Sequence, residues 1–460
     1  MKKFCAFLVL PLLLLACGCH RKTTKDPSTD TSKITDTDPT SSKEKPQPIE
    51  NVTIYVSNDG IGSKDGKSIE EPTTLNHALD IMNSGDKIIL LSGTYNLNTE
   101  VTIDKSGTDE TRNELIGQGE VIFDFIDSKE DDIQTNGGIN ILGSYWTIEN
   151  IKVCNSDYFG FTIKGSGCSL TNCISNDNCS GGFFINNASS TTITNCMAYN
   201  NTYTGSSASG FYISGSGSNN IIESCVAYDN QDSGFVALSS KGVTFNKCIA
   251  IENGLVDLAS QRSGFVFNNK GHEFTNCISY NNAYAGFLVP AAYQEKGSYK
   301  LDKCSAINNH NRNYYLRKNV NDEVSITDLL SFNNYDSNED GTIDALKDMV
   351  SGNVSNSIFL YSNTDNSYNY VLADEEYSSS NIDTIIPLDL TGYTNEYKIN
   401  TVIPETMKEY IDETEYIVKY YKDGSINLYD YLDRATLFQD ELFTKLEIDE
   451  PSYFGANVNE

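Results

Sequence analysis

The sequence predicts an all-β fold, a parallel β-helix (β-solenoid) with an N-terminal cap and a C-terminal capping segment. Two repeated motifs, one built on cysteine and one on a Gly-Phe pair, run in step through the middle of the 460-residue chain. Successive cysteines of the first motif lie 23 to 29 residues apart, a period typical of repeat architectures. Short runs of alternating apolar residues fill the repeats without a helical period, which favours strands.

The cysteine motif has an apolar residue three positions before the cysteine, Ser or Ala two positions after it, and Asn five positions after it. Equivalent residues of successive coils stack in a β-helix, so each position should form a column along the molecule. The repeating cysteines are Cys173, Cys196, Cys225, Cys248, Cys277 and Cys304. The predicted asparagine ladder consists of Asn178, Asn201, Asn230, Asn253, Asn282 and Asn309. The Gly-Phe pairs are Gly160-Phe161, Gly182-Phe183, Gly210-Phe211, Gly234-Phe235, Gly264-Phe265 and Gly286-Phe287.

One cysteine per coil favours a column of buried free thiols, since a thiol behaves as a small apolar group. Disulfides are the alternative for an exported protein. Cys154, preceded by Ile151, is expected to be a seventh member of the column without the asparagine. Cys168 and Cys179 fall outside the pattern, and a bridge between them stays open.

The N-terminus predicts export. A basic start and an apolar run lead to Leu14-Leu15-Ala16-Cys17, the pattern of a bacterial lipobox in which Cys17 receives the lipid. An ordinary cleaved signal peptide and lipidation of Cys19 are the alternatives to this lipoprotein signal peptide over residues 1–17. Residues 18–50 are rich in Thr, Ser, Asp, Lys and Pro, which predicts a disordered tether. We therefore expect an extracytoplasmic protein, lipid-anchored at the bacterial cell envelope.

The rest of the chain divides into three predicted segments. Residues 51–135 should form the N-terminal cap and first coils, with a short helix from Leu75 to Met82. Residues 136–362 hold the β-helix repeats. Residues 363–460 form a C-terminal capping or packing segment, in which Pro404 is expected to begin a helix that reaches about Tyr421.

Several segments carry a resemblance to a known family in addition to the two repeats. They are Tyr55-Val56-Ser57, Gly85-Asp86 through Gly93-Thr94-Tyr95, Val121–Phe125, Gly143–Ile148 and Asp423–Leu432. Together they are similar to polysaccharide lyase family 9 over most of the chain after the tether. The resemblance implies a right-handed parallel β-helix and calcium-dependent β-elimination of pectate. It also implies a lysine base and an aspartate-rich calcium site around the Gly-Phe turns.

The positions that correspond to the family's catalytic groups mostly carry other residues here. Ser209 stands where the family has an aspartate before Gly-Phe. A later family pattern of two Asp, Gly, Trp and Asp corresponds to Asp232-Ser233-Gly234-Phe235-Val236, in which only Asp232 keeps a carboxylate. Val266 stands at the position of the lysine base, and Leu288 at a position where the family often has Asp. The catalytic residues therefore remain unknown from the sequence.

Three basic residues near these turns, Lys241, Arg262 and Lys270, are the candidates for a relocated base. The alternative for each is a solvated turn residue. His272, in a strand-like run, is expected to be packed or exposed rather than catalytic.

Exposed aromatic rings could offer flat surfaces for sugars, although many of them could equally belong to coil packing. The candidates are Tyr199, Tyr203, Tyr228, Tyr280, Tyr284 and Tyr293.

A second candidate site for calcium follows the repeats. The pattern of a calcium-binding loop is matched over nine positions, with Lys347 where the loop would place its last acidic ligand. A structural Ca²⁺ site and a plain acidic turn are the two interpretations. The potential ligands are Asp336, Asn338, Asp340, Thr342 and Asp344, to which Asp232 adds the carboxylate that remains from the family site.

The formal net charge of −30 argues against a nucleic-acid partner, because the phosphate backbone requires basic residues. We expect a monomer that contacts the membrane only through its lipid and binds polysaccharide. Two functional hypotheses remain. One is a lyase-like enzyme acting on acidic polysaccharide, and the other is a non-catalytic β-helix that binds glycan or another surface partner.

Overall fold

The computed structural model describes residues 51–125, 137–202, 208–255, 261–291, 297–316, 323–333, 348–355 and 357–362, and five short strands beyond them. The chain divides at Glu50, and the fold described here is that of the second unit, Glu50–Glu460. The predicted signal peptide, lipid site, tether and calcium loop lie outside the described residues. Within the part of the chain that is described, no helix is long and apolar enough to cross a membrane.

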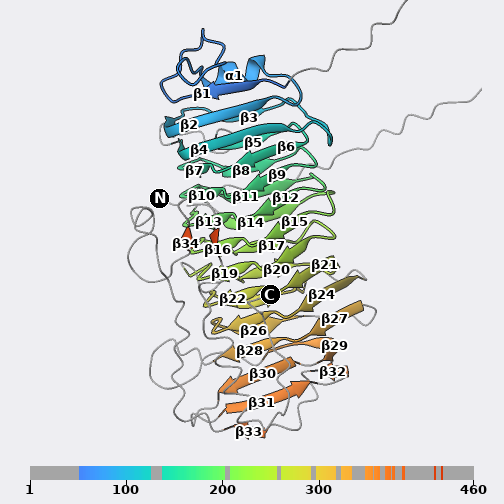
Figure 1. The fold of residues 1–460 in the computed structure, drawn as a ribbon. Coiled ribbons are helices and arrows are strands. Elements are labelled where there is room, and N and C mark those ends of the chain that lie inside the picture. The colour runs from blue at the N-terminus through green and yellow to red at the C-terminus, as the bar shows by residue number, and fades with distance from the viewer. Residues whose placement is uncertain are drawn as a thin grey trace, which may run out of the picture. The chain divides into compact units, whose positions relative to one another are not determined.

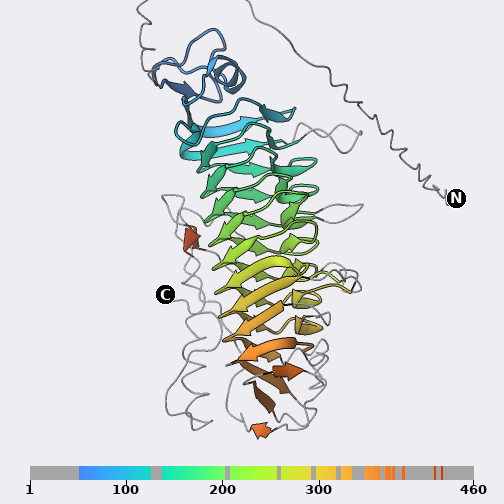
Figure 2. The same ribbon diagram turned by 90° about the vertical axis from the view of Figure 1, so that its right-hand side faces the viewer.

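The described chain is nearly all β-structure and winds through three parallel ladders of strands (Figures 1 and 2). The predicted parallel β-helix is therefore confirmed. We name the ladders A, C and B in the order in which each coil visits them, for example β9, β10, β11 and then β12 of the next coil. Strands β2 and β4 are long enough to belong to both ladder A and the start of ladder C.

Ladder A begins in the cap and continues to the last coil. Its strands are β1 (Thr53–Val56), β2 (Lys87–Asn96), β4 (Asn113–Asp124), β6 (Trp146–Glu149), β9 (Ser169–Thr171), β12 (Thr192–Thr194), β15 (Ile221–Glu223), β18 (Thr244–Asn246), β21 (Lys270–Thr275), β24 (Ser298–Asp302), β27 (Glu323–Thr327) and β29 (Ser351–Ser355).

Ladder C holds the residues that directly follow each motif cysteine. Its strands are β7 (Lys152–Cys154), β10 (Ile174–Asn176), β13 (Met197–Tyr199), β16 (Val226–Tyr228), β19 (Ile249–Ile251), β22 (Ile278–Tyr280), β25 (Ser305–Ile307), β28 (Leu330–Asn333) and β30 (Ser357–Ser362).

Ladder B holds the Gly-Phe motifs. Its strands are β3 (Val101–Ile103), β5 (Ile139–Ile141), β8 (Phe159–Ile163), β11 (Gly181–Asn186), β14 (Ser209–Ser214), β17 (Phe235–Ala237), β20 (Phe265–Phe267), β23 (Ala285–Leu288) and β26 (Arg312–Tyr315).

The N-terminal coil carries the predicted short helix, α1 (Leu75–Ile81). Thr74 caps it by accepting a hydrogen bond from the backbone N–H of His77, and Leu75 and Ala78 are buried against the first coils. Burying these apolar groups covers the core at the first coil, where a solenoid would otherwise expose it.

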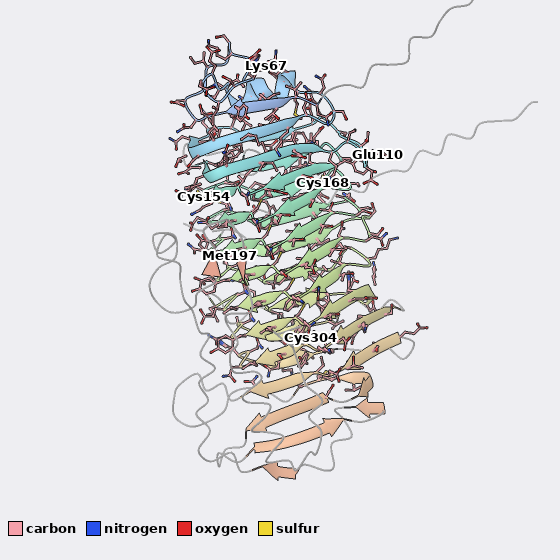
Figure 3. The ribbon with its side chains drawn as sticks, viewed as in Figure 1. Lys67, Glu110, Cys154, Cys168, Met197 and Cys304 are labelled. Atoms are coloured by element: carbon pink, nitrogen blue, oxygen red, sulfur yellow. The ribbon has the colours of Figure 1, made fainter. Side chains whose placement is uncertain are left out.

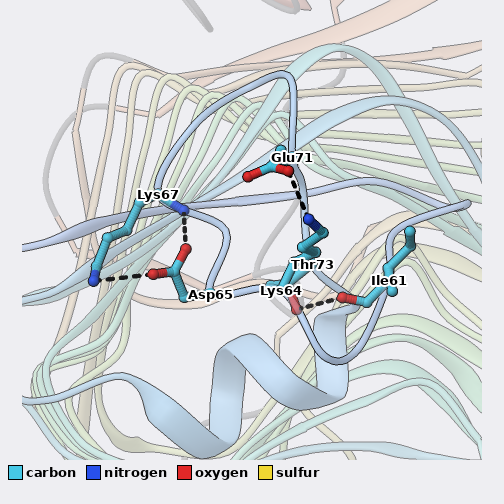
Figure 4. Close-up of polar contacts among 6 residues, drawn as sticks. All are labelled: Ile61, Lys64, Asp65, Lys67, Glu71 and Thr73. Carbon is cyan, nitrogen blue, oxygen red and sulfur yellow. Dashed lines mark hydrogen bonds and ion pairs between the residues drawn. The ribbon is translucent and has the colours of Figure 1, made fainter.

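Two exposed ion pairs sit in the loop between β1 and α1 (Figure 4). Lys64 Nζ lies 2.6 Å from Glu71, and Lys67 Nζ lies 3.0 Å from Asp65. Such solvated pairs contribute little to stability, so the cap depends on its buried apolar groups.

The last coils end in antiparallel strands. β31 (Tyr368–Ala373) pairs with β30 and with β33 (Ile386–Leu388), and β32 (Glu376–Ser378) pairs with β29. Further on, β34 (Lys419–Tyr420) pairs with β35 (Ile426–Asn427). The predicted helix therefore does not include Lys419 and Tyr420, which are in a strand, a structure that an aromatic residue such as Tyr420 favours. The rest of that predicted helix lies outside the described residues.

The Gly-Phe motif builds a stack of rings inside the solenoid. Phe161, Phe183, Phe211, Phe235 and Phe265 follow one another at centroid distances of 4.8 to 5.0 Å with nearly parallel planes. Phe287 and Tyr314 continue the stack at 4.7 and 5.2 Å. These rings are almost completely buried and form one face of the core.

The glycine of each Gly-Phe pair faces the small residue of the cysteine motif. A Cβ on Gly182 would lie 2.6 Å from the Cβ of Ala198, and one on Gly160 would lie 2.0 Å from Ser175 Oγ. Side chains larger than Ser or Ala at the facing position would overlap ladder B. The two repeated motifs are therefore the two sides of one contact, which explains why they run in step.

The six ladder asparagines lie in one fully buried column. The Nδ2 of each donates to the Oδ1 of the next, from Asn178 to Asn201 at 3.0 Å and on through the column to Asn309. That same Oδ1 also accepts the backbone N–H of the preceding asparagine, as Asn201 does from Asn178. The second Nδ2 hydrogen of Asn230 is donated to the Ala198 carbonyl oxygen. The buried amides thus have their hydrogen-bonding capacity filled.

The ladder ends on a carboxylate. Asn309 donates to Asn313 Oδ1, Asn313 Nδ2 donates to Ser331 Oγ, and that hydroxyl donates to Asp348 Oδ2 at 2.5 Å. The backbone N–H of Tyr314 donates to the other Asp348 oxygen. Burial raises the pKa of Asp348 to about 6, so at neutral pH the ladder points its donors at a charged acceptor.

The motif cysteines are stacked thiols. Each Sγ lies within hydrogen-bonding distance of the carbonyl two residues earlier, for example 3.4 Å from Cys173 to Thr171. Burial raises the pKa of Cys173, Cys196 and Cys277, so these thiols are poor nucleophiles. Cys168 is also a buried thiol, which donates to the Gly143 carbonyl oxygen and is not bridged to Cys179.

The prediction that Cys154 joins the column is wrong. Strand pairing aligns Val153 with Ser175 and Cys154 with Asn176, which places Ile151 at the column position. Ile151 is 1% exposed and packs in the core. Cys154, which is labelled in Figure 3, lies three positions further on, in register with Asn176 and Tyr199. The strand register, which decides this, is not evident from spacing alone.

We expect Gly234→Ala to destabilise the fold by about 1–3 kcal/mol, because overpacking forces backbone to move. The added Cβ would lie 2.8 Å from the Gly264 carbonyl oxygen and 3.0 Å from the Ala250 Cβ. Gly62→Ala is the matched control, since its Cβ would have no neighbour closer than 3.5 Å. Urea unfolding of both variants measures the effect, and an equal change in the two would contradict the packing argument.

Candidate functional site

Coil length varies only at the two edges of ladder B. The connection from ladder A to ladder C has two residues in every coil from β9 to β28. The connection from ladder C to ladder B ranges from four residues, 177–180, to fourteen, 125–138. The return from ladder B to ladder A reaches nine residues, 289–297. Functional groups concentrate on variable connections beside a rigid scaffold, so ladder B is the candidate functional face.

The outward positions of ladder B alternate with the stacked rings and carry mainly apolar and aromatic residues. Phe184, Val236 and Val266 are only 6–8% exposed, and Leu288 is 1% exposed. Val236, Val266 and Leu288 belong to a cluster outside the solenoid core, distinct from the Phe stack. The outer face of ladder B comprises Thr162, Phe184, Tyr212, Val236, Val266, Leu288 and Tyr315.

The residues at the lyase positions lie together on this face, but their chemistry differs from that of a calcium site. Ser209 and Ser233 are buried, and Val236 pairs in register with Val266. Asp232 supplies one carboxylate, which accepts a hydrogen bond from Ser233 Oγ at 3.2 Å. A calcium ion requires six to eight oxygens, usually several from carboxylates. These residues do not fit the calcium ion that the family resemblance implies, and Val266 has no proton-accepting group.

The three basic candidates lie at opposite edges of ladder B. Lys241 and Lys270 are exposed on the turns that follow β17 and β20, where the backbone N–H of Gly242 donates to the Lys270 carbonyl. Arg262 precedes β20 at the other edge, and its guanidinium donates to the Gln231 carbonyl oxygen at 2.9 Å. Arg262 therefore neighbours Asp232, whereas the two lysines are separated from it by the width of the ladder.

The described residues offer no ready-made metal centre. Among them, no group of three or more His, Cys, Asp or Glu is arranged to hold an ion. The loop Asp336–Asp344 lies outside the described residues and stays a prediction.

An aromatic cluster that the sequence reasoning missed lies at the N-terminal part of the ladder B face. Tyr158, Phe159, Phe184 and Tyr212 contact one another, with Phe184 and Tyr212 stacked at 5.3 Å. The Phe159 and Tyr212 rings are nearly parallel, at 10° and 6.4 Å. The phenylalanines are buried, and the two tyrosines are partly exposed. The signal in the sequence for Phe184 and Tyr212 was their place directly after a Gly-Phe pair, whereas Tyr158 and Phe159 directly precede one.

The tyrosines predicted from the sequence as sugar contacts lie elsewhere. Tyr199, Tyr228 and Tyr280 occupy one outward column of ladder C. Tyr284 lies at the edge of ladder B, 6.1 Å from the ring of Tyr315. Tyr203 and Tyr293 fall outside the described residues.

His272 is a structural residue at the turn between ladders B and A. It is fully buried, and its Nδ1 accepts the backbone N–H of Val243. Nε2 must therefore carry the proton and donate to Asn268 Oδ1 at 3.0 Å. Burial lowers the pKa of His272 from 6.5 to about 4, so the ring is neutral at physiological pH.

Three parallel ladders wound in this order define the class of parallel β-helix proteins. A family model described as the Pel9A-like, right handed beta helix region matches residues 54–323, and the chain belongs to this family. The resemblance to polysaccharide lyase family 9 is confirmed, and the helix is right-handed.

Curated relatives carry the name Pectate lyase L. The protein of Dickeya dadantii (strain 3937) is 30% identical over 156 residues, which cover 32% of this chain and 37% of that protein. The protein of Thermoclostridium stercorarium is 29% identical over 266 residues, which cover 51% of this chain and 21% of that protein. The chain thus spans between about a fifth and little more than a third of the length of these relatives.

Two solved structures share the fold. Pectate lyase Pel9A aligns with a TM-score of 0.55 at 22% identity, over 75% of this chain and 93% of its own. A rhamnogalacturonan lyase aligns with a TM-score of 0.51 at 21% identity, over 61% of this chain and 82% of its own.

The burial of His272 predicts a pH dependence of stability. In the unfolded chain His272 becomes protonated below about pH 6.5, whereas in the folded chain it becomes protonated only near pH 4. The contribution of neutral His272 to the free energy of unfolding is therefore fully present above pH 6.5. It falls by about 3 kcal/mol as the pH drops to 4. Urea unfolding at pH 7 and pH 4 should show a smaller loss for His272→Asn, which keeps an acceptor for Val243. An equal loss in both proteins would show that other groups carry the acid sensitivity.

Proposed function

We propose that this protein recognises polysaccharide along the outer face of ladder B, as an exported member of the lyase-like family held at the cell envelope by a lipid on Cys17. The observation that carries the proposal is the aromatic cluster around Tyr212 on the face whose flanking connections vary. Aromatic rings pack against the C–H faces of sugars, while the tyrosine hydroxyls bond to the rim. Family membership supports a polysaccharide as the ligand.

The chemistry of this face favours binding over the family's elimination reaction. β-Elimination requires a base beside the proton next to a uronic carboxylate, and positive charge to stabilise the developing anion. The face presents Val236 and Val266 in register and one carboxylate, Asp232. An overall charge of −30 adds repulsion toward a polyanionic chain. We therefore propose glycan binding as the primary function.

Lyase activity on an acidic glycan is the second candidate, favoured by the relatives named pectate lyase. Calcium would then have to bind through residues other than those at the family position. Arg262 bonds to the carbonyl of Gln231, which directly precedes Asp232, and Lys241 and Lys270 lie across the ladder.

One experiment separates the two candidates. Soluble protein beginning at His20 is incubated with polygalacturonate, related acidic glycans and neutral glycans, with calcium and with chelator. We expect binding by affinity electrophoresis or calorimetry and no rise in absorbance at the unsaturated-uronide band. A calcium-dependent rise would establish a lyase and overturn the binding-only proposal. Neither binding nor absorbance across the panel would remove polysaccharide as the ligand.

We expect Tyr212→Ala to weaken binding of the glycan found on this panel by roughly 1 kcal/mol, or about fivefold in Kd. Tyr212→Phe should retain most of the affinity, because the ring supplies the stacking surface. Tyr55→Ala, in β1 of the cap, is the matched control and should leave Kd unchanged. Equal effects of the two alanine substitutions would place the binding site away from the aromatic cluster.

A further inference from the structure

The outer face of ladder B changes in character along the solenoid axis. In order of the coils, strand register gives the outward column Thr102, Asn140, Thr162, Phe184, Tyr212, Val236, Val266 and Leu288. The three aliphatic residues of this column are only 1–6% exposed. In contrast, Thr102 is exposed, and Asn140 and Tyr212 are partly exposed. The N-terminal part of the face is therefore the part that presents side chains to a ligand.

Four polar side chains of this part, Glu100, Thr102, Asn140 and Thr162, are named the polar cluster. Glu100 Oε1 accepts hydrogen bonds from Thr102 Oγ1 and from Asn140 Nδ2, both at 2.9 Å. The bond from Nδ2 fixes the orientation of the Asn140 amide, so its Oδ1 is the end turned away from the carboxylate. Thr162 follows Asn140 in register on the next strand and precedes Phe184 of the aromatic cluster.

Two atoms of the polar cluster have unused hydrogen-bonding capacity. Asn140 Oδ1 and Thr162 Oγ1 are buried and bond to nothing in the described part of the chain. Thr162 is 4% exposed, and because Phe161 and Ile163 beside it face the core, its side chain lies on the outer face. Buried polar groups in folded proteins are nearly always bonded to protein, water or a ligand. These two atoms therefore mark a place where an outside group completes the bonding.

The unused positions of the polar cluster call for a ligand that donates hydrogen bonds. Asn140 Oδ1 and the Glu100 carboxylate only accept, and the Thr162 hydroxyl donates and accepts. Sugar hydroxyls supply the donors. A uronic carboxylate supplies none and is repelled by the charge of Glu100. Asp104 and Lys164, which directly follow β3 and β8, carry opposite charges and offset one another at the neighbouring edge.

We propose that the polar cluster and the aromatic cluster are neighbouring subsites for uncharged sugar units of one glycan. One unit donates hydroxyls to Asn140 Oδ1 and Glu100 and bonds to the Thr162 hydroxyl. The next packs its C–H face on the Tyr212 ring. Tyr212 lies two strands beyond Thr162, roughly 10 Å by the strand spacing, so one chain reaches both subsites. This inference rests on the proposed function and specifies a neutral glycan as the ligand.

The first test compares glycans that differ only in charge. Soluble protein beginning at His20 is titrated by calorimetry, in chelator, with polygalacturonate and with its carboxyl-reduced form, alongside galactan, xylan and glucan. We expect at least one neutral glycan to bind about tenfold more tightly than polygalacturonate. Tighter binding of polygalacturonate than of every neutral glycan would overturn the subsite and leave the proposed function standing. Absence of binding across the panel would overturn the proposed function, and the subsite with it.

Thr162→Val replaces the unbonded hydroxyl by a methyl group of similar shape. We expect Kd for the best neutral glycan to rise about fivefold. The urea midpoint should stay unchanged or rise, because the hydroxyl makes no bond that holds the fold together. Thr192→Val, at an outward position of β12 on ladder A, is the matched control and should leave Kd unchanged. An unchanged Kd for Thr162→Val would overturn the subsite, whatever the stability of the variant.

Glu100→Gln tests the charge separately. Glutamine keeps an acceptor for Thr102 and Asn140 but removes the negative charge, so the preference for neutral glycan over polygalacturonate should narrow by about threefold or more. Glu149→Gln removes the same charge from an outward position of β6 on ladder A and should leave the preference unchanged. Equal changes in the two variants would show that net charge alone disfavours acidic glycan, which would overturn the role of Glu100.

Discussion

The rest of the structure depends on one packing contact. In it, a glycine of ladder B meets a Ser or Ala of ladder C and the amide of an asparagine. The three groups fill a corner in which an extra methyl on Gly234 would lie within 3.0 Å of its neighbours. The asparagine can occupy this corner because its amide satisfies backbone and side-chain partners without leaving a polar group exposed to the core. The Phe stack and the thiol column then fill the remaining space.

This construction separates stability from recognition. The interior repeats with little change, while the outward residues of ladder B change from coil to coil. A lyase of this fold needs carboxylates and a base on that surface, and here the same positions carry valine, serine and aromatic rings. Family membership thus determines the fold but not the chemistry of the outer surface, because outward side chains are not needed to pack the solenoid core.

The repeat was readable from the sequence because the cysteine, asparagine and glycine positions each keep one residue type from coil to coil. The asparagine column, the thiol column and the glycine positions all follow from spacing alone. Cys154 was misplaced because its distance to Ile151 mimics the motif, and only strand register shows that Ile151 is the inward residue. The aromatic cluster was missed because Phe159, Phe184 and Tyr212 come from three coils and meet only when the coils stack. Arg262 and Lys270 lie at the edges of ladder B, next to connections that differ in length from coil to coil. The repeat therefore does not predict which residues they face.

The asparagine ladder runs head to tail, and its two ends differ chemically. At the start, the backbone N–H of Ser156 donates to Asn178 Oδ1. At the end, Asn313 donates to the Ser331 hydroxyl, which donates to Asp348. Every internal asparagine both receives and gives the same bond, so an added coil would continue the chain of amides wherever it was inserted. Duplication or deletion of a repeat could therefore lengthen or shorten this protein by whole coils. The groups at the two ends of the asparagine ladder would have to be kept.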